Sequence, residues 1–295
     1  MPVLAIDLGG TKLATAIVDR GGQFLASEKH PVVRTSPAAT MEQMVAQCHV
    51  AVKSAGVDWH DISRVGLIVP GVADAAGCVW APNLWGDANV PVAAELARRI
   101  PAPLTMESDR AGYVVGEQWL GVARDLADVV FVAVGTGIGV GILAGGRLIR
   151  GAGGVAGAAG WMALTGEFRE LYSSVGCWEA EAAGPALARA AGRTSAEAVV
   201  ADARAGNAVC LSAIGRAGDT LGLGIANLVS IFNPQIVVLG GGLMQAGDLF
   251  LARIRTTVRK WANPRSANQV RIELSTLGDK AGLLGAARLA LDEIP

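Results

Sequence analysis

The sequence predicts an α/β protein in which one strand pattern occurs twice. Apolar runs that end in glycine turns alternate with segments whose apolar residues recur at helical spacing, and this alternation is typical of the α/β class. A strand, a Gly/Thr turn, a strand, a Gly-Gly turn and a third strand begin at Val3 and again at Val129. Asp7 and Gly21 are 14 residues apart, as are Val132 and Gly146. Matching spacing of this kind indicates a duplicated architecture.

In the first half, turn residues separate short apolar runs. We expect strands at Val3–Leu8, Leu13–Val18, Phe24–Glu28, Val65–Val69 and Pro103–Met106. Apolar residues at helical spacing predict helices at Thr40–Ala55 and Val92–Ile100, and a further helix is expected at Arg110–Leu120.

The second half repeats the strands and then becomes mainly helical. We expect strands at Val129–Val134, Ile138–Leu143, Leu148–Ile149, Gln235–Leu239 and Val270–Leu274. Alanine-rich amphipathic segments predict helices at Ala180–Ala191, Ala196–Ala205, Ala208–Phe232 and Ala281–Leu291, and Phe250, Ile254, Val258 and Trp261 mark one more.

Composition limits the classes of partner. The 295 residues are 52% hydrophobic and 17% charged, and 25 Lys and Arg against 26 Asp and Glu give a net charge of −1. No basic field is available to bind nucleic acid or an anionic membrane, so a phosphorylated ligand must be held by local donors. The longest uncharged runs are interrupted by glycines, no leader precedes the first strand, and the four cysteines are scattered. We therefore predict a cytoplasmic, reduced protein without a membrane span.

The first Gly/Thr turn, Asp7 to Lys12, has the parts of a phosphate site. Gly9 and Gly10 let main-chain N–H groups approach phosphate oxygens, and Thr11 adds a hydroxyl. Asp7 could hold Mg²⁺ through water. The alternative is a hairpin turn whose aspartate caps its own backbone.

Two more glycine segments have the same character. Gly135, Thr136 and Gly137 stand at the equivalent place in the repeat, and two such turns would hold a polyphosphate from two sides. Gly240, Gly241 and Gly242 follow a buried strand and suggest a base or ribose site; a helix cap or tight strand-to-helix packing are the alternatives. No G-x-x-x-x-G-K-[ST] pattern is present, and the G-x-G-x-x-A match at Gly139–Ala144 lies in a strand and opens no helix.

Taken together, the motifs resemble the ROK family of repressors and sugar kinases across nearly the whole chain. The segments that carry the resemblance are Asp7–Lys12, Val69–Asp74, Pro82–Trp85, Glu107–Asp109, Gly135–Gly139, Gly176–Glu179 and Leu239–Gly242. The resemblance implies an actin/hexokinase-like duplicated fold of two lobes, with ATP and substrate in the cleft between them. The expected lobes are residues 1–108, with the helix at about 281–295 packed back on them, and residues 109–280. The resemblance also favours a homodimer.

The resemblance implies a role for each matched polar residue. Asp109 is the expected general base, which would take the proton of a sugar hydroxyl as the P–O bond forms; alternatively it is the N-cap of the following helix. Asn83 and Glu179 match substrate-binding positions, and Gly71 belongs to the same substrate set. Loop or helix-start roles remain the alternatives for Asn83 and Glu179.

The chain departs from the family pattern at three places. Ser108 replaces the asparagine before the catalytic aspartate, and Ala158 and Trp161 replace a glutamate and a histidine that contact sugar hydroxyls. In the family's zinc-binding segment only Cys177 remains among the cysteines, so we predict no zinc site. Because Ala158 and Trp161 cannot pair with ring hydroxyls as the family residues do, the preferred substrate is expected to differ from glucose.

The functional prediction is an ATP- and Mg²⁺-dependent kinase that phosphorylates a hydroxyl of a small sugar or sugar-like polyol. Alternatives are a cyclitol (carbasugar) kinase and a non-catalytic homologue that binds sugar or nucleotide. Family repressors carry a helix-turn-helix before the first strand, and the strand here begins at Val3, so a kinase is favoured over a repressor. A dinucleotide-dependent oxidoreductase lacks the acidic ribose-binding residue at the expected spacing.

Overall fold

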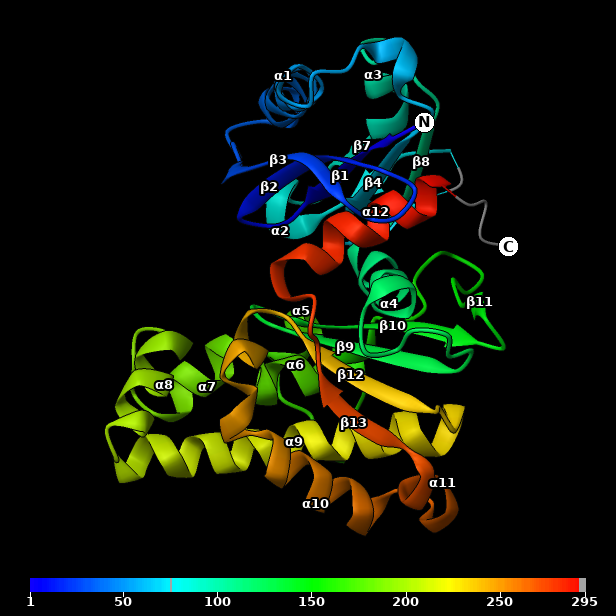
Figure 1. Cartoon of the computed structure of the whole chain (residues 1–295). Helices are drawn as coiled ribbons and strands as arrows, with labels where there is room; N and C mark the ends of the chain where they lie inside the picture. The colour runs from blue at the N-terminus through cyan, green and yellow to red at the C-terminus, as the bar shows by residue number, and fades with distance from the viewer. Residues whose placement is uncertain (75, 292–295) are drawn as a thin grey trace. The chain divides into compact units, whose positions relative to one another are not determined.

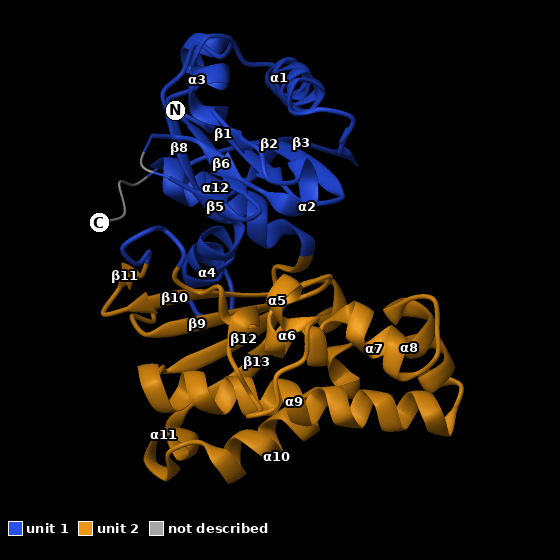
Figure 2. Ribbon diagram, turned by 180° about the vertical axis from the view of Figure 1, so that it is seen from behind, with its two compact units in different colours: residues 1–124, 150–155, 279–295 blue, residues 125–149, 156–278 orange. Residues whose placement is uncertain are grey.

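The computed structural model describes residues 1–74 and 76–291, which form two compact units (Figure 2). Unit 1 contains residues 1–124, a short segment at 150–155 and the chain from 279 onward, and unit 2 contains residues 125–149 and 156–278. The lobe boundary at residues 108 and 109 remains a prediction, and the part of the expected last helix beyond residue 291 lies outside the described residues.

Unit 1 is built on a five-stranded mixed sheet. Its strands are β1 (Val3–Leu8), β2 (Lys12–Val18), β3 (Phe24–Pro31), β4 (Val65–Val69) and β8 (Leu104–Ser108). The strand order is β3-β2-β1-β4-β8. The pairs β3–β2 and β2–β1 are antiparallel, and the pairs β1–β4 and β4–β8 are parallel.

Unit 2 contains a sheet of the same design. Its strands are β9 (Val129–Val134), β10 (Ile138–Ala144), β11 (Arg147–Leu148), β12 (Ile236–Gly240) and β13 (Arg271–Leu274). The order β11-β10-β9-β12-β13 repeats the order of unit 1, and the parallel and antiparallel pairings correspond strand for strand. The repeat read from the glycine spacing is therefore a repeat of sheet topology.

A small antiparallel sheet of unit 1 was not predicted. It consists of β5 (Val72–Ala73), β6 (Val79–Trp80) and β7 (Asn89–Val90), and the short helix α2 (Pro82–Trp85) lies between β6 and β7. Two-residue strands give no alternation pattern that sequence analysis can detect.

Helices cover both faces of the unit 1 sheet. Leu4, Ile6 and Leu8 of β1 share a core with α1 (Pro37–Ser54) and α3 (Val92–Ala97). Successive side chains of a strand point to opposite faces, and α4 (Asp109–Leu120) and α12 (Ala281–Leu291) pack on the other face (Figure 1). That second face also carries Asp7, whose carboxylate touches α12 at Gly282.

The α4 and α12 helices approach each other through glycine. A Cβ atom at Gly285 would overlap the backbone carbonyl of Gly112, and one at Gly116 would lie 2.6 Å from the carbonyl oxygen of Ala281. The close crossing fixes the start of α4, and with it Asp109, against the sheet.

Helices also pack against the unit 2 sheet. They are α5 (Tyr172–Val175), α6 (Cys177–Ala182), α7 (Gly184–Ala190), α8 (Ala196–Arg204), α9 (Ala208–Phe232), α10 (Leu251–Trp261) and α11 (Pro264–Gln269), with 3-10 turns at Ala159–Trp161 and Gly242–Leu249. Further 3-10 turns lie at Trp59–Asp61 and Gly278–Lys280. Val130 and Val132 of β9 pack with Trp178, Leu221 and Ile225 in the unit 2 core.

One helix prediction is wrong. The expected helix Ala180–Ala191 is divided into α6 and α7, because Ala183 is extended (φ −74°, ψ 170°). Pro185 lies at the start of α7, where a missing N–H is harmless, but inside a continuous helix it would remove a hydrogen bond. The other expected elements differ from the structure by up to three residues at their ends. In the described part of the chain, no helix is both long enough and apolar enough to cross a membrane.

Candidate active site

The turn between β1 and β2 carries the first predicted phosphate site. Gly9 N–H donates to the Lys12 carbonyl at 2.8 Å, and Gly10, Thr11 and Lys12 are partly or fully exposed. Asp7 Oδ1 is buried and has no hydrogen-bond partner among the described residues. Among the described residues, Oδ1 therefore accepts no hydrogen bond from the backbone of its own turn, as the alternative of a self-capping aspartate would require of it.

Asp109 is the first residue of α4 and does not cap it. The N-cap is Ser108, whose hydroxyl accepts a hydrogen bond of 3.4 Å from Ala111 N–H, so the expected capping alternative for Asp109 is wrong. Asp109 Oδ1 instead accepts from Arg110 N–H at 2.7 Å. Burial raises the pKa of Asp109, and the charge of Arg110 and this hydrogen bond oppose that rise.

Asp7 and Asp109 lie near each other in unit 1. Burial, and after it the charge of Asp109, raise the pKa of Asp7 from 3.8 to about 7, while Lys29 lowers it and Asp279 raises it. The charge of Asp7, the burial of the Tyr113 phenol, and the charges of Asp109 and Asp279 raise the pKa of Tyr113, which lies on α4. Two acidic groups that repel each other and lack full solvation form a region where a divalent cation or a substrate proton would be stabilised.

Gly71 and Asn83, the other substrate residues predicted in unit 1, lie in different surroundings. The Gly71 carbonyl accepts a hydrogen bond of 3.1 Å from Arg110 Nη1 at the start of α4. Asn83 lies on α2 and is exposed. The structure thus links Gly71 to the Asp109 segment, and among residues 1–74 and 76–291 it shows no such hydrogen bond for Asn83.

In unit 2, two of the predicted glycine segments lie side by side. Gly135 N–H donates to the Gly137 carbonyl at 2.9 Å, and a Cβ atom on Gly135 would lie 3.8 Å from the backbone nitrogen of Gly242. Gly241 has φ +88° and packs against Val134 at the end of β9. Thr136 and Gly242 are exposed, so this paired turn presents hydroxyl and backbone groups at its surface.

Glu179 supports the Gly135–Gly137 turn from α6. Its Oε2 accepts a hydrogen bond of 2.8 Å from Ile138 N–H, and burial raises its pKa while that hydrogen bond lowers it. Gly184 at the start of α7 donates to the Gly135 carbonyl at 2.8 Å. The break between α6 and α7 therefore serves to hold the turn from two helices.

The Ala158–Trp161 segment adjoins Glu179. A Cβ atom on Gly160 would lie 3.0 Å from Glu179 Oε2. Ala158 is half-buried and Trp161 is 56% exposed. The three predicted substrate positions of unit 2 are thus neighbours around one glycine.

The segment that matches the family's zinc region is held by other contacts. Buried Cys177 Sγ accepts a hydrogen bond of 3.4 Å from Leu164 N–H, and Tyr172 Oη donates to Glu181 at 2.7 Å. Within residues 1–74 and 76–291, one group of three potential metal ligands is present: Asp58, His60 and Asp61, at the surface of unit 1. The absence of zinc remains a prediction.

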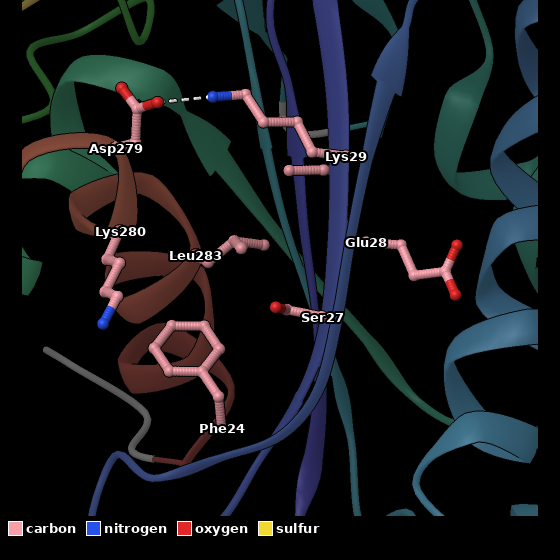
Figure 3. A pocket seen from close by; sticks show the side chains of 8 residues that line it. Phe24, Ser27, Glu28, Lys29, Asp279, Lys280 and Leu283 are labelled. Carbon is pink, nitrogen blue, oxygen red and sulfur yellow. Dashed lines mark hydrogen bonds and ion pairs between the residues drawn. The ribbon is translucent and has the colours of Figure 1, made fainter.

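Sequence reasoning did not identify a pocket of about 320 Å³ in unit 1. It lies between β3 and α12 and includes Phe24, Ser27, Lys29 and Lys280 among its lining residues (Figure 3). Lys29 Nζ pairs with Asp279 at 2.6 Å, and this contact lowers the pKa of Asp279. Arg110 was also missed, although a cation in the first turn of a helix is unusual enough to be a signal.

Two five-stranded sheets of one topology, each with a glycine turn after its first strand, define the actin-like class of ATPase folds. The ROK family model matches residues 3–293, and the chain belongs to the ROK family. It is 31% identical to a glucokinase of Streptomyces coelicolor over 99% of this chain and 98% of that protein. It is 28% identical to a xylose repressor of Caldicellulosiruptor bescii over 83% of this chain and 66% of that protein.

The solved structures agree with this assignment. A ROK family glucokinase of Streptomyces griseus, crystallised with glucose and AMPPNP, is similar with a TM-score of 0.83 at 29% identity, and 99% of each chain is covered. A ROK hexokinase of Thermus thermophilus has a TM-score of 0.82 at 30% identity, over 100% of this chain and 99% of that one. The predicted actin/hexokinase-like fold and the predicted family are both confirmed.

Proposed function

We propose that this chain transfers the terminal phosphoryl group of ATP to a hydroxyl of a small sugar or sugar-like polyol. The family and the similarity to glucokinases support the class of reaction. The observation that carries the proposal is the half-buried Asp109 at the start of α4, near a second carboxylate, Asp7.

In this proposal Asp109 is the general base. A sugar hydroxyl is a weak nucleophile, and a carboxylate within hydrogen-bond reach accepts its proton as the new P–O bond forms. A base works best when its pKa lies near the working pH, and burial moves the pKa of Asp109 in that direction. Arg110 N–H, on Oδ1, limits rotation of the carboxylate.

The ATP phosphates would bind at the glycine turns. The amides of Gly10 and Thr11 in unit 1 and of Thr136 and Gly137 in unit 2 are the donors proposed for them. The Gly240–Gly242 segment, which adjoins Gly135, is the proposed site of the nucleoside. Lys12, exposed at the start of β2, would add positive charge.

Mg²⁺ fits the acidic group of unit 1. Asp7 Oδ1 is buried and has no partner in the described residues, and carboxylate oxygen is the ligand type that Mg²⁺ prefers. Asp7 would hold the ion, directly or through water, and the ion would neutralise charge on the phosphates. We propose no zinc and no nucleic-acid partner, and a homodimer is our expectation for the assembly.

Specificity would come from unit 2. Ala158 offers no hydrogen-bonding group and Trp161 exposes an apolar indole, so a deoxy-sugar, an amino-sugar derivative or a carbasugar-type cyclitol would suit this surface better than glucose. A non-catalytic sugar-binding homologue is the second candidate, and the similarity to a xylose repressor favours it.

An ADP-formation assay over a panel of sugars and cyclitols tests the proposal. The expected result is sugar-dependent ADP release that requires Mg²⁺ and is lost in Asp109→Asn. Binding of sugar and nucleotide without turnover would support the second candidate, and plain glucose as the best substrate would refute the specificity argument.

A further inference from the structure

A buried arginine follows the proposed base. Arg110 is 8% exposed, and its guanidinium lies at the start of α4. Nη1 donates to the Gly71 carbonyl at 3.1 Å and Nη2 donates to the Gly154 carbonyl at 3.2 Å. One side chain thus connects the first turn of α4 to two loops that are distant in sequence.

The first loop is the turn between β4 and β5. Gly71 has φ +90°, and a Cβ atom there would overlap the carbonyl of Trp80 on β6. The turn therefore has little room to adjust, and the Arg110 contact fixes its carbonyl. Gly71 is also one of the substrate residues predicted from the sequence.

The second loop is the segment Arg150–Val155, which we call the strap. It packs with unit 1, although the residues before and after it belong to unit 2. Gly154 has φ +69°, and its Cβ position lies 3.1 Å from the Ala73 carbonyl. At its other end, Arg150 forms an ion pair with Glu107 on β8.

The cost of this arrangement indicates that it has a use. A cation in the first turn of a helix is opposed by the helix dipole, and a buried guanidinium loses hydration. Burial lowers the pKa of Arg110, and the carboxylates of Asp109 and Glu107 offset this. The guanidinium of Arg110 donates to the two carbonyls from two different nitrogens in a fixed plane, whereas a lysine ammonium presents all its donors from one nitrogen.

We propose that Arg110 is a positioning residue for phosphoryl transfer: it holds the Gly71 turn and the strap against the helix start that carries Asp109. The inference rests on the proposed function. Arg110 acts through these neighbours and through the carboxylate it adjoins, and it need not touch the substrate.

Two variants and a control test the inference. Arg110→Met removes both donors at similar length, Arg110→Lys keeps the charge but presents its donors from a single nitrogen, and Arg34→Met removes an exposed arginine of unit 1. We expect kcat to fall roughly tenfold to a hundredfold in Arg110→Met, as for a small misplacement of reacting groups. The KM for sugar should rise, the KM for ATP should stay unchanged, and Arg110→Lys should be intermediate.

Hydrogen exchange tests the contacts without turnover. Amides of residues 71–73 and 150–155 should exchange faster in Arg110→Met than in the wild type or Arg34→Met. Exchange rates that do not change in Arg110→Met overturn this inference alone. So does an Arg110→Met enzyme whose kcat and KM for sugar equal those of an active wild type. A wild type that forms no ADP with any sugar overturns the proposed function and this inference with it. If Arg110→Met fails to fold, Arg110→Lys is compared in its place.

Discussion

Glu179 Oε2 accepts a hydrogen bond of 2.8 Å from the backbone N–H of Ile138, directly after the Gly135–Gly137 turn. The side chain expected to bind substrate thus also supports a proposed phosphate site. The two roles make different demands on the residue, because the backbone contact needs only an acceptor oxygen.

Substitutions of Glu179 separate the two roles. Glu179→Ala should destabilise the protein by about 1–3 kcal/mol, because it leaves the Ile138 N–H without its partner. Glu179→Gln keeps an acceptor oxygen and should unfold close to the wild type. If Glu179 also binds sugar, the Gln variant should raise the KM for sugar while the KM for ATP stays unchanged. Thermal unfolding and steady-state kinetics measure the two effects.

Removal of the proposed base should stop chemistry and spare nucleotide binding. Asp109→Asn should lower kcat by roughly 10²-fold or more, since general-base catalysis contributes about 10²–10⁴-fold. Binding of a non-hydrolysable ATP analogue, measured by calorimetry, should be little changed. Asp87→Asn, which alters an exposed aspartate of the same unit, is the matched control. An Asp109→Asn enzyme with the wild-type rate would remove Asp109 from the mechanism.

Stability should fall as pH rises from about 4 to about 7. The pKa of Asp7 is raised from 3.8 to about 7, so in this window the native state binds more protons than the unfolded state. Stability from the protonated group is complete below pH 4 and is lost as the pH rises through 7. One pKa unit corresponds to about 1.4 kcal/mol, which sets an upper limit of about 4 kcal/mol for Asp7.

Asp7→Asn should remove that part of the pH dependence. The variant should be more stable than the wild type at pH 8 and similar to it at pH 4, as measured by urea unfolding at a series of pH values. Equal pH profiles for the two proteins would show that the Asp7 pKa is not raised.

Restoring the family residues should restore a preference for glucose. Ala158→Glu combined with Trp161→His supplies partners for ring hydroxyls, and a site built to pair a hydroxyl discriminates strongly for it. The ratio of kcat/KM for glucose to kcat/KM for the best wild-type substrate should rise roughly tenfold or more. The single variants serve as controls, and an unchanged ratio would mean that specificity lies elsewhere.

The crossing of α4 and α12 should not tolerate a methyl group. Gly285→Ala would overlap the Gly112 carbonyl and should cost about 1–3 kcal/mol in stability. Gly215→Ala is a matched control in helix α9, where a Cβ atom meets nothing within 4 Å, and it should stabilise by about 0.5–1 kcal/mol. A lower Tm for Gly285→Ala together with a higher Tm for Gly215→Ala would confirm the prediction, and equal changes in Tm would contradict it.

The sequence was sufficient to locate the strands of the two five-stranded sheets, because their central strands are continuous apolar runs followed by glycine turns. Val3–Leu8, Val65–Val69 and Val129–Val134 have the predicted bounds. Helix α9, Ala208–Phe232, was also predicted to the residue from its alanine-rich amphipathic pattern, and in the structure Asn207 caps its start. Local signals decide such elements.

Long-range contacts decide the rest. The break at Ala183 depends on the bond from Gly184 to Gly135, which is distant in sequence. The link from Arg110 to Gly71 and Gly154 likewise cannot be read from spacing, because it depends on which loops the fold brings to α4. The glycine motifs located the Gly135 and Gly240 segments, whereas their adjacency appears only in the structure.

The chain passes between the units after residues 124, 149, 155 and 278, so neither unit is one uninterrupted stretch of polypeptide. A fragment that stops at residue 124 would lack α12, and the buried leucines of that helix, such as Leu283 and Leu284, would no longer cover the sheet. Neither half is therefore suited to independent synthesis or exchange between genes. During translation one face of the unit 1 sheet therefore stays incompletely covered until α12 has been synthesised.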